Sequence, residues 1–172
     1  HTLLVVVSQS GETADTIAAM KECKARGARV LAIVNVVGST IAKLADDVVY
    51  TWAGPEIAVA TTKGYTTQVA VMDMLAVYLA RRLGRLDDAQ KKELVDAILQ
   101  FPSLIQRSID LNPNLPALAE KYHSHNDVFF IGRNLDYAAS MEGSLKLKEI
   151  SYLHSEAYAA GELKHGTIAL IE

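Results

Sequence analysis

Three charged residues toward the end of the chain have the types and the spacing that proton transfer needs. Lys146 and Glu149 are three residues apart, and Glu142 precedes Lys146 by four, so a helix would place all three on one face. A carboxylate there could move a proton between adjacent carbons while the nearby ammonium stabilises the enolic charge. On spacing alone, the simpler interpretation is a solvated row of ion pairs, each contributing about 0.2–0.5 kcal/mol.

A second candidate site is the segment S-Q-S-G-E-T at residues 8–13, which lies between an apolar run and a helical pattern. Open α/β sheets bind ligands at such strand-to-helix turns. Free amides at the helix start, the helix dipole and the hydroxyls of Ser8, Ser10 and Thr13 suit a phosphate monoester, and Gly11 permits close backbone approach. Because the loop contains no lysine, a sugar phosphate fits better than a triphosphate. A serine-rich helix cap without a ligand is the alternative interpretation.

His165 is a third candidate, because it lies in G-E-L-K-H-G at residues 161–166, where the glycines predict a loop or a short helix. Histidine titrates near neutral pH and can act as a general acid and base. A lone histidine is more often structural or exposed. No comparable pattern surrounds His154, and His123 and His125 are interpreted as surface groups near a loop.

The composition excludes several classes of protein. The chain has 172 residues, a formal net charge of −3 and no long run of one sign, so binding to nucleic acid is not expected. The apolar stretch at 69–80 is shorter than the roughly 20 residues of a membrane-spanning helix. The single cysteine, Cys23, excludes an internal disulfide framework and favours a reducing cytoplasm. The acids and histidines have no recognised ligand spacing, so neither a metal nor a cofactor is expected.

The candidate loop at 8–13 must be positioned by the elements around it. The apolar run at 3–7, rich in β-branched residues, predicts a strand that is covered on both faces in a parallel sheet. The following segments predict a helix at 13–26, a strand at 29–35, a helix at 39–45 and a strand at 48–52. Alternation of buried strands with helices favours right-handed crossovers and a doubly wound α/β sheet.

The second half of the chain begins with helices and then restarts a strand, turn and helix unit. The predicted elements are helices at 62–83 and 87–111, the latter kinked at Pro102, a short helix at 117–123, a strand at 128–131, a polar turn at 132–136 and a helix at 137–152. Pro113 and Pro116 indicate a boundary between these parts. This restart suggests a second α/β unit.

Three blocks of sequence carry a resemblance to one family: SQSGET at 8–13, ATTKGYTTQ at 60–68 and EGSLKLKEISYLHSEAYAAGELKHG at 142–166. They resemble the sugar isomerase (SIS) domains of glutamine:fructose-6-phosphate aminotransferases, the glucosamine-6-phosphate synthases, over essentially the whole chain. SQSGET alone indicates only a phosphosugar-binding SIS domain, whereas KLKEISYLH and ELKHG are more specific to the synthases. The implied fold is a flavodoxin-like three-layer αβα arrangement in a truncated tandem, with residues 1–112 from a first SIS domain and 113–172 from a second.

The resemblance implies a role for each candidate residue. Glu149 would be the base for isomerisation and Lys146 its partner. His165 would open the sugar ring in the active site of a neighbouring subunit, which implies a homodimer. The sugar phosphate would be held by Ser8, Gln9, Ser10 and Thr13, with Val59 and Thr61 lining the same pocket.

The chain also departs from the family pattern. The family has a phosphate-contacting threonine and serine before the first strand, a Schiff-base lysine near its carboxyl terminus and an amino-terminal glutaminase domain with a nucleophilic cysteine, and none of these is present. Cys23, predicted in mid-helix, does not replace that nucleophile. Thr167 stands where proline is usual, and Asn134 where glycine is frequent, although asparagine tolerates left-handed conformations.

The expected function is therefore that of an isomerase segment of such a synthase. It would bind fructose 6-phosphate or glucosamine 6-phosphate for ketose-to-aldosamine isomerisation, be incomplete for catalysis in isolation, and belong to a parent chain with a glutaminase domain. A related phosphosugar isomerase or deglycase without that domain is one alternative. A non-catalytic sugar-phosphate sensor, which would need neither Glu149 nor His165, is another.

Overall fold

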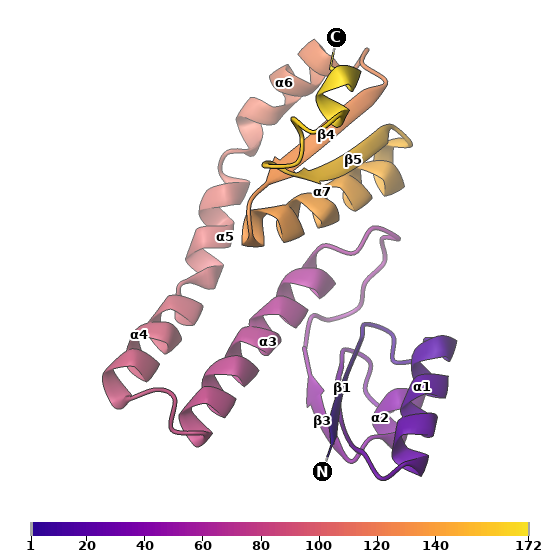
Figure 1. Ribbon diagram of the computed structural model, residues 1–172, viewed down its shortest axis with the longest axis vertical. Coiled ribbons are helices and arrows are strands. Elements are labelled where there is room, and N and C mark those ends of the chain that lie inside the picture. Colours follow the sequence, from indigo (N-terminus) through magenta and orange to yellow (C-terminus); the bar gives the residue numbers. More distant parts are fainter. Residues whose placement is uncertain (1, 172) are drawn as a thin grey trace. The chain divides into compact units, whose positions relative to one another are not determined.

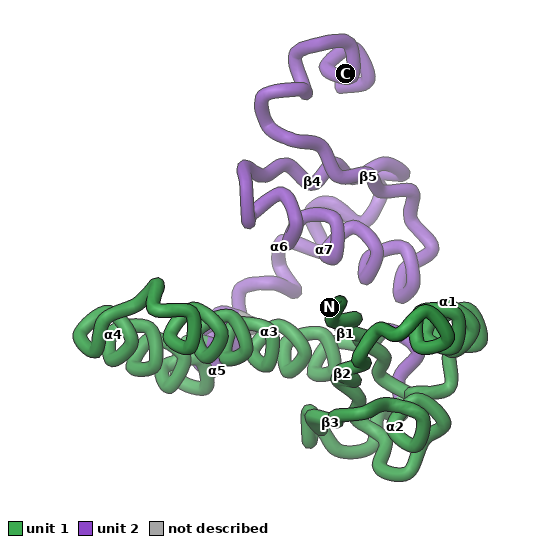
Figure 2. The backbone as a smooth tube through the Cα atoms, turned by 60° about the horizontal axis from the view of Figure 1, so that its bottom comes forward, with its two compact units in different colours: residues 1–57, 61–104 green, residues 58–60, 105–172 purple. Residues whose placement is uncertain are grey.

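The computed structural model describes residues 2–171, apart from the side chain of residue 112. The chain forms two compact units, drawn in different colours in Figure 2. Unit 1 comprises the chain up to Ile57 together with Thr61–Leu104, and unit 2 comprises Ala58–Ala60 together with the chain from Ile105 onward. The SIS boundary between residues 112 and 113 stays a prediction. Within the described part of the chain, no helix is long and apolar enough to cross a membrane.

Unit 1 contains a parallel sheet whose strands alternate with helices (Figure 1). The strand order is β1-β2-β3, with Val6 of β1 opposite Ala32 of β2 and Ala32 opposite Val48 of β3. The predicted alternation of strand and helix is confirmed. The elements are β1 (Leu3–Ser8), α1 (Ala14–Ala25), β2 (Arg29–Val34), α2 (Thr40–Leu44) and β3 (Asp47–Tyr50).

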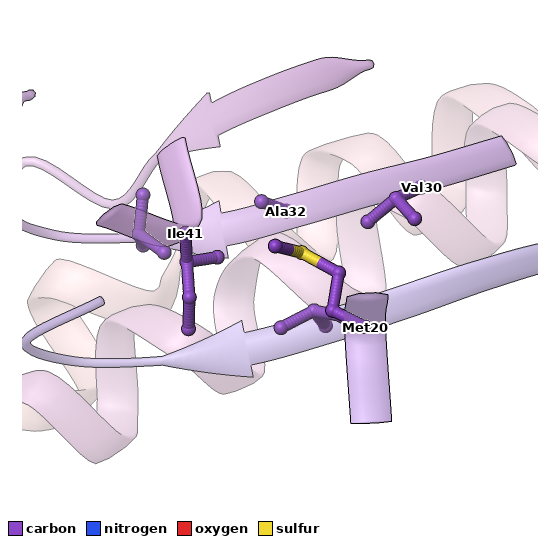
Figure 3. Packing of buried hydrophobic residues seen from close by; sticks show 6 residues of the cluster. Met20, Val30, Ala32 and Ile41 are labelled. Atoms are coloured by element: carbon purple, nitrogen blue, oxygen red, sulfur yellow. The ribbon is translucent and has the colours of Figure 1, made fainter. Parts of the chain in front are cut away.

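The core of unit 1 lies between this sheet and helices α1 and α2. Met20 of α1 is completely buried, and Figure 3 shows it with Val30, Ala32 and Ile41 in the same cluster. β2 is the central strand, and its Ile33 is buried as well. The expectation that β1 is covered on both faces is wrong, because Leu3 and Val7 remain 50% and 41% exposed. Alternate side chains of β1 point to opposite faces of the sheet, so Val6 enters the core beside α1, whereas Leu3 and Val7 lie on the face that is left exposed.

Three helices follow in place of the two that the sequence predicts. They are α3 (Lys63–Arg82), α4 (Asp88–Leu99) and α5 (Phe101–Ile109). The start of α4 is fixed by a capping box, in which Asp87 and Gln90 each accept a hydrogen bond from the other's backbone amide. In place of one helix kinked at Pro102, the helix is interrupted at Gln100, because proline has no amide hydrogen and its ring clashes with the carbonyl of Ile98 in a continuous helix.

Unit 2 contains a second parallel strand pair joined by a helix. β4 (Asp127–Gly132) pairs with β5 (His154–Ala159), and α7 (Leu135–Ser151) connects them. Before them come η1 (Asn112–Asn114) and α6 (Leu115–Tyr122), and after them η2 (Thr167–Leu170). β5 was not expected, because its sequence His-Ser-Glu-Ala-Tyr-Ala contains no apolar run. It forms because β4 supplies hydrogen bonds along its whole length.

Close contacts fix α7 against the strands of unit 2. Ser144 of α7 and Ser155 of β5 are both buried, with their hydroxyls 3.0 Å apart, and Ser155 also donates to the Ser144 carbonyl at 2.9 Å. A Cβ on Gly132 would lie 2.4 Å from the backbone of Asp136, so only glycine allows the turn into α7. Asn134 adopts φ +49 in that turn, as the tolerance of asparagine for positive φ predicted.

Candidate functional site

The loop between β1 and α1 is curled so that its hydroxyls lie close together. Ser8 Oγ is 3.1 Å from Thr13 Oγ1, and the Gly11 amide donates to Ser8 Oγ at 3.1 Å. The Glu12 amide donates to Ser10 Oγ at 3.2 Å. Thr13 is the N-cap of α1 but makes no side-chain cap hydrogen bond. The first amides of α1 have no carbonyl one turn earlier, so the helix presents unsatisfied donors at this loop.

The start of α3 packs against the same loop. A Cβ on Gly64 would lie 2.5 Å from Thr61 Oγ1 and 2.9 Å from Gln9 Cδ, so the absence of a side chain lets Gln9 and Thr61 approach. Gln68 donates to Gln9 Oε1 at 3.4 Å, whereas the buried Gln9 Nε2 has no hydrogen-bond partner among the described residues. Sequence reasoning did not single out Gly64 or Gln68. The signal in the sequence was a glycine, Gly64, in the first turn of a predicted helix, because a glycine there lets another segment approach the helix backbone closely.

Two further predicted pocket residues differ in their surroundings. The Thr61 hydroxyl donates a hydrogen bond to Glu56 Oε1 at 2.5 Å, so its hydrogen is already used by a carboxylate. Val59 is 93% exposed and belongs to Ala58–Ala60, which groups with unit 2. Unit 1 therefore brings Ser8, Gln9, Ser10, Thr13 and Thr61 to the carboxyl end of β1, and Val59 is not among them.

The charged residues of α7 form one cluster on the helix. Lys146 Nζ lies 2.6 Å from Glu149 Oε2 and 3.4 Å from Glu142 Oε1. The side chains of Lys146, Glu142 and Glu149 are only 15%, 23% and 29% exposed. The side chains of a solvated row of ion pairs would be far more exposed. Those of Arg26 and Glu22, which pair on α1, are 79% and 63% exposed. The cluster is thus a partly shielded acid and base arrangement.

This shielded cluster predicts a stability contribution from Lys146 that is lost only at alkaline pH. The hydrogen bond to Glu149, assisted by the charge of Glu142, raises the pKa of Lys146 above its ordinary value. A raised folded-state pKa means that the stabilisation is complete below the unfolded pKa of about 10.4 and disappears as pH rises through the folded pKa. Thermal unfolding of the wild type and Lys146→Met should give a difference in Tm that is constant from about pH 7 to 10 and shrinks above that range.

Lys148→Met provides the matched control, because Lys148 lies on the same helix and has no ion pair within residues 2–171. Its Tm difference from the wild type should be smaller than that of Lys146→Met at neutral pH. If the Lys146→Met difference already falls between about pH 7 and 9, the raised pKa of Lys146 is contradicted.

The histidines occupy different environments in unit 2. His165 is exposed in the run of turns that follows β5, and its backbone amide donates to the Glu162 carbonyl at 2.9 Å. The predicted loop around it is therefore confirmed. His154, for which the sequence indicated no role, lies 2.6 Å from Asp127 and links the starts of β5 and β4. His123 is also exposed, as expected.

Metal-ligating and thiol groups give no further site in the described residues. Across residues 2–171, no three His, Cys, Asp or Glu side chains are grouped so that they could hold a metal ion. Cys23 lies within α1, as predicted, and is partly buried.

The sheet and its loop define a class of protein: an α/β domain with a parallel sheet, in which hydroxyls and helix amides lie at the carboxyl end of a strand. The family model of the SIS domain matches residues 1–78 and 121–172. The chain belongs to the SIS domain family.

Individual relatives are more specific than the family model. The chain is 59% identical over 171 residues to the glutamine--fructose-6-phosphate aminotransferase [isomerizing] of Symbiobacterium thermophilum and 50% identical to that of Thermococcus kodakarensis. In both comparisons, 99% of this chain is covered but only 28% of the relative. The chain thus spans about a quarter of the length of these curated relatives.

Solved structures agree with the observed fold. The C-terminal domain of glucosamine-fructose-6-phosphate aminotransferase from Francisella tularensis superposes with a TM-score of 0.96 at 37% identity, covering 99% of this chain and 48% of that one. A putative phosphosugar isomerase from Clostridium difficile superposes with a TM-score of 0.85 at 27% identity, covering 99% of this chain and 49% of that one. The predicted SIS fold is confirmed.

Proposed function

We propose that this chain is part of the isomerase region of a glutamine:fructose-6-phosphate aminotransferase and binds fructose 6-phosphate or glucosamine 6-phosphate. The observation that carries the proposal is the loop at 8–13, where Ser8, Ser10 and Thr13 hydroxyls gather at the start of α1. The 59% identity to one such aminotransferase over 99% of the chain supports the same substrate class. Because the chain spans 28% of that relative, we assign ammonia transfer to the full-length protein.

The phosphate is bound by the loop and by the first amides of α1. The dianion attracts the positive end of the helix dipole and accepts hydrogen bonds from the hydroxyls of Ser8, Ser10 and Thr13. The free Nε2 donor of Gln9 gains an acceptor when the ligand binds, which removes the cost of a buried unpaired amide. Thr61, which donates to Glu56, suits a sugar hydroxyl better than the phosphate itself.

The isomerisation is assigned to the α7 cluster and to His165. Glu149 removes a proton from one carbon of the open-chain sugar and returns it to the neighbouring carbon. The ammonium of Lys146, 2.6 Å from Glu149, stabilises the enolic charge. His165 opens the sugar ring and does so in the active site of a partner subunit, so the working form is a homodimer. That Val59 lines the same pocket stays a prediction.

The proposal has consequences for partners and location. The full-length protein carries a glutaminase domain that supplies ammonia, and the protein acts in the cytoplasm without a metal, a cofactor, nucleic acid or a membrane. The two alternative functions are not favoured. The aminotransferases described above share 50–59% identity with this chain, whereas the phosphosugar isomerase shares 27%. A sensor, in turn, would not need the shielded Lys146 and Glu149 pair.

Titration of the ¹⁵N-labelled chain with fructose 6-phosphate tests the binding site. We expect amide shift changes at residues 8–13 and 61–62, because these segments of unit 1 form the proposed phosphate site. Fructose, which lacks the phosphate, is the matched control and should leave the amides of residues 8–13 unshifted at the same concentration. Equal responses to both sugars, or shifts elsewhere only, would contradict the phosphate site.

A further inference from the structure

The first residues of α2 form hydrogen bonds with the loop at 8–13, the proposed phosphate site. The Thr40 amide donates to Glu12 Oε1 at 2.8 Å, and the Ile41 amide donates to the Gly11 carbonyl at 3.0 Å. Ser39 is 3% exposed, and a Cβ on Gly11 would lie 2.1 Å from its hydroxyl oxygen. Two consecutive loop residues are therefore tied to a segment that follows them by almost 30 positions in the sequence.

These hydrogen bonds are made at Gly11 and Glu12, the part of the loop where the backbone conformation is most restricted. Gly11 has φ +68, a conformation that costs about 1 kcal/mol or more for residues with a side chain. Its amide donates to Ser8 Oγ, and the next amide, that of Glu12, donates to Ser10 Oγ. The hydrogen bonds to α2 therefore fix the backbone whose amides orient the hydroxyls of Ser8 and Ser10, two of the proposed phosphate-binding groups.

The hydrogen bond from Thr40 also determines where the charge of Glu12 lies. A carboxylate beside a phosphate site would repel the dianion if it were free to turn toward it. The hydrogen bond from Thr40 is the largest cause of a lowered pKa of Glu12, and the charge of Lys43 on α2 acts in the same direction. The carboxylate is therefore ionised at neutral pH and bound to the start of α2.

We propose that Glu12 is a positioning residue for phosphate binding, which orders the loop at 8–13 and keeps its own charge on α2 through the Thr40 amide. The proposal rests on the function proposed above and adds a residue that does not itself contact the ligand. In that role, Glu12 affects the binding of substrate more than the chemical step.

The experiment compares Glu12→Ala, Thr40→Pro and the double variant in the full-length protein. Proline at residue 40, the first position of α2, removes the donor amide but is tolerated there, and Ser39 before it is already extended at ψ 164. Each single variant should raise KM for fructose 6-phosphate about ten-fold with kcat changed by less than about three-fold, because one charge-assisted hydrogen bond is lost. Inorganic phosphate should inhibit each variant correspondingly less.

The double variant shows whether the two residues act through one bond. We expect its KM to equal that of the single variants within about two-fold, since both substitutions remove the same interaction. Hydrogen exchange of the peptide containing residues 8–13 should be faster in all three variants. Glu22→Ala is the matched control, because Glu22 is an exposed carboxylate of the same unit that pairs with Arg26, and it should leave KM and this exchange unchanged.

Independent, additive effects of Glu12→Ala and Thr40→Pro would overturn the proposal, as would unchanged exchange of the loop in Glu12→Ala. Faster exchange with unchanged KM would show that loop order does not govern binding and would overturn it too. If the wild type neither turns over nor binds the sugar phosphate, the proposed function fails and the role in ligand binding fails with it. The exchange comparison would still decide separately whether Glu12 orders the loop.

Discussion

Glu149→Gln in the full-length protein is expected to lower kcat for sugar isomerisation by about 10²–10⁴-fold, the contribution of a general base. The amide is nearly isosteric with the carboxylate but accepts no proton, and it removes the negative charge that lies 2.6 Å from the ammonium of Lys146. Binding of fructose 6-phosphate, measured by calorimetry, should change by less than about three-fold, because we propose that the loop at 8–13 holds the phosphate.

Glu142→Gln is the matched control for this variant. Glu142 approaches the same lysine, but at 3.4 Å, and is shielded to a similar degree. Its substitution should lower kcat far less than Glu149→Gln does. Equal losses in the two variants would assign the effect to the charge balance around Lys146 and not to proton transfer by Glu149.

Met20→Ala is expected to destabilise unit 1 by about 2–5 kcal/mol, the range measured for truncation of large buried side chains. Met20 is completely buried between α1 and the sheet, in contact with the cluster that includes Val30 and Ile41. The variant loses the buried thioether and leaves a cavity against β2. Urea unfolding followed by circular dichroism measures the change as a lower midpoint.

Met74→Ala provides the comparison with the same change in chemistry. Met74 lies on α3 and is 49% exposed, so its truncation should cost less than about 1 kcal/mol. Similar losses for both methionines would show that the cluster around Met20 is not the main core of unit 1.

The regular parts of the fold were predictable because their signals are local. β-branched runs at β1, β2 and β3, and helical spacing between them, indicate a parallel sheet without reference to the rest of the chain. β5 was missed for the opposite reason. Its residues have no strand pattern of their own, and the strand exists because β4 lies alongside it. The burial of β1 was also predicted wrongly, since the covering of each face of a strand depends on the elements that pack against the sheet.

The candidate site was predictable in its residues but not in its environment. Spacing on a helix was enough to bring Lys146 and Glu149 together, and a strand followed by S-Q-S-G-E-T was enough to locate the loop. The approach of Gly64 to Gln9 and the hydrogen bond between Glu12 and Thr40 both join segments that are distant in sequence. Such contacts arise from packing, which composition and periodicity do not encode.

The two buried serines at the contact of α7 with β5 have a consequence for the proposed proton transfer. Because Ser144 and Ser155 join their hydroxyls inside unit 2, the helix can neither slide nor roll on β5 without leaving two polar groups unpaired. Any displacement that brings Glu149 nearer to a sugar must therefore carry the whole strand pair with it. In the proposed reaction, the distance between Glu149 and the sugar would then be adjusted by movement of α7 together with the strands and by the rotamers of the carboxylate.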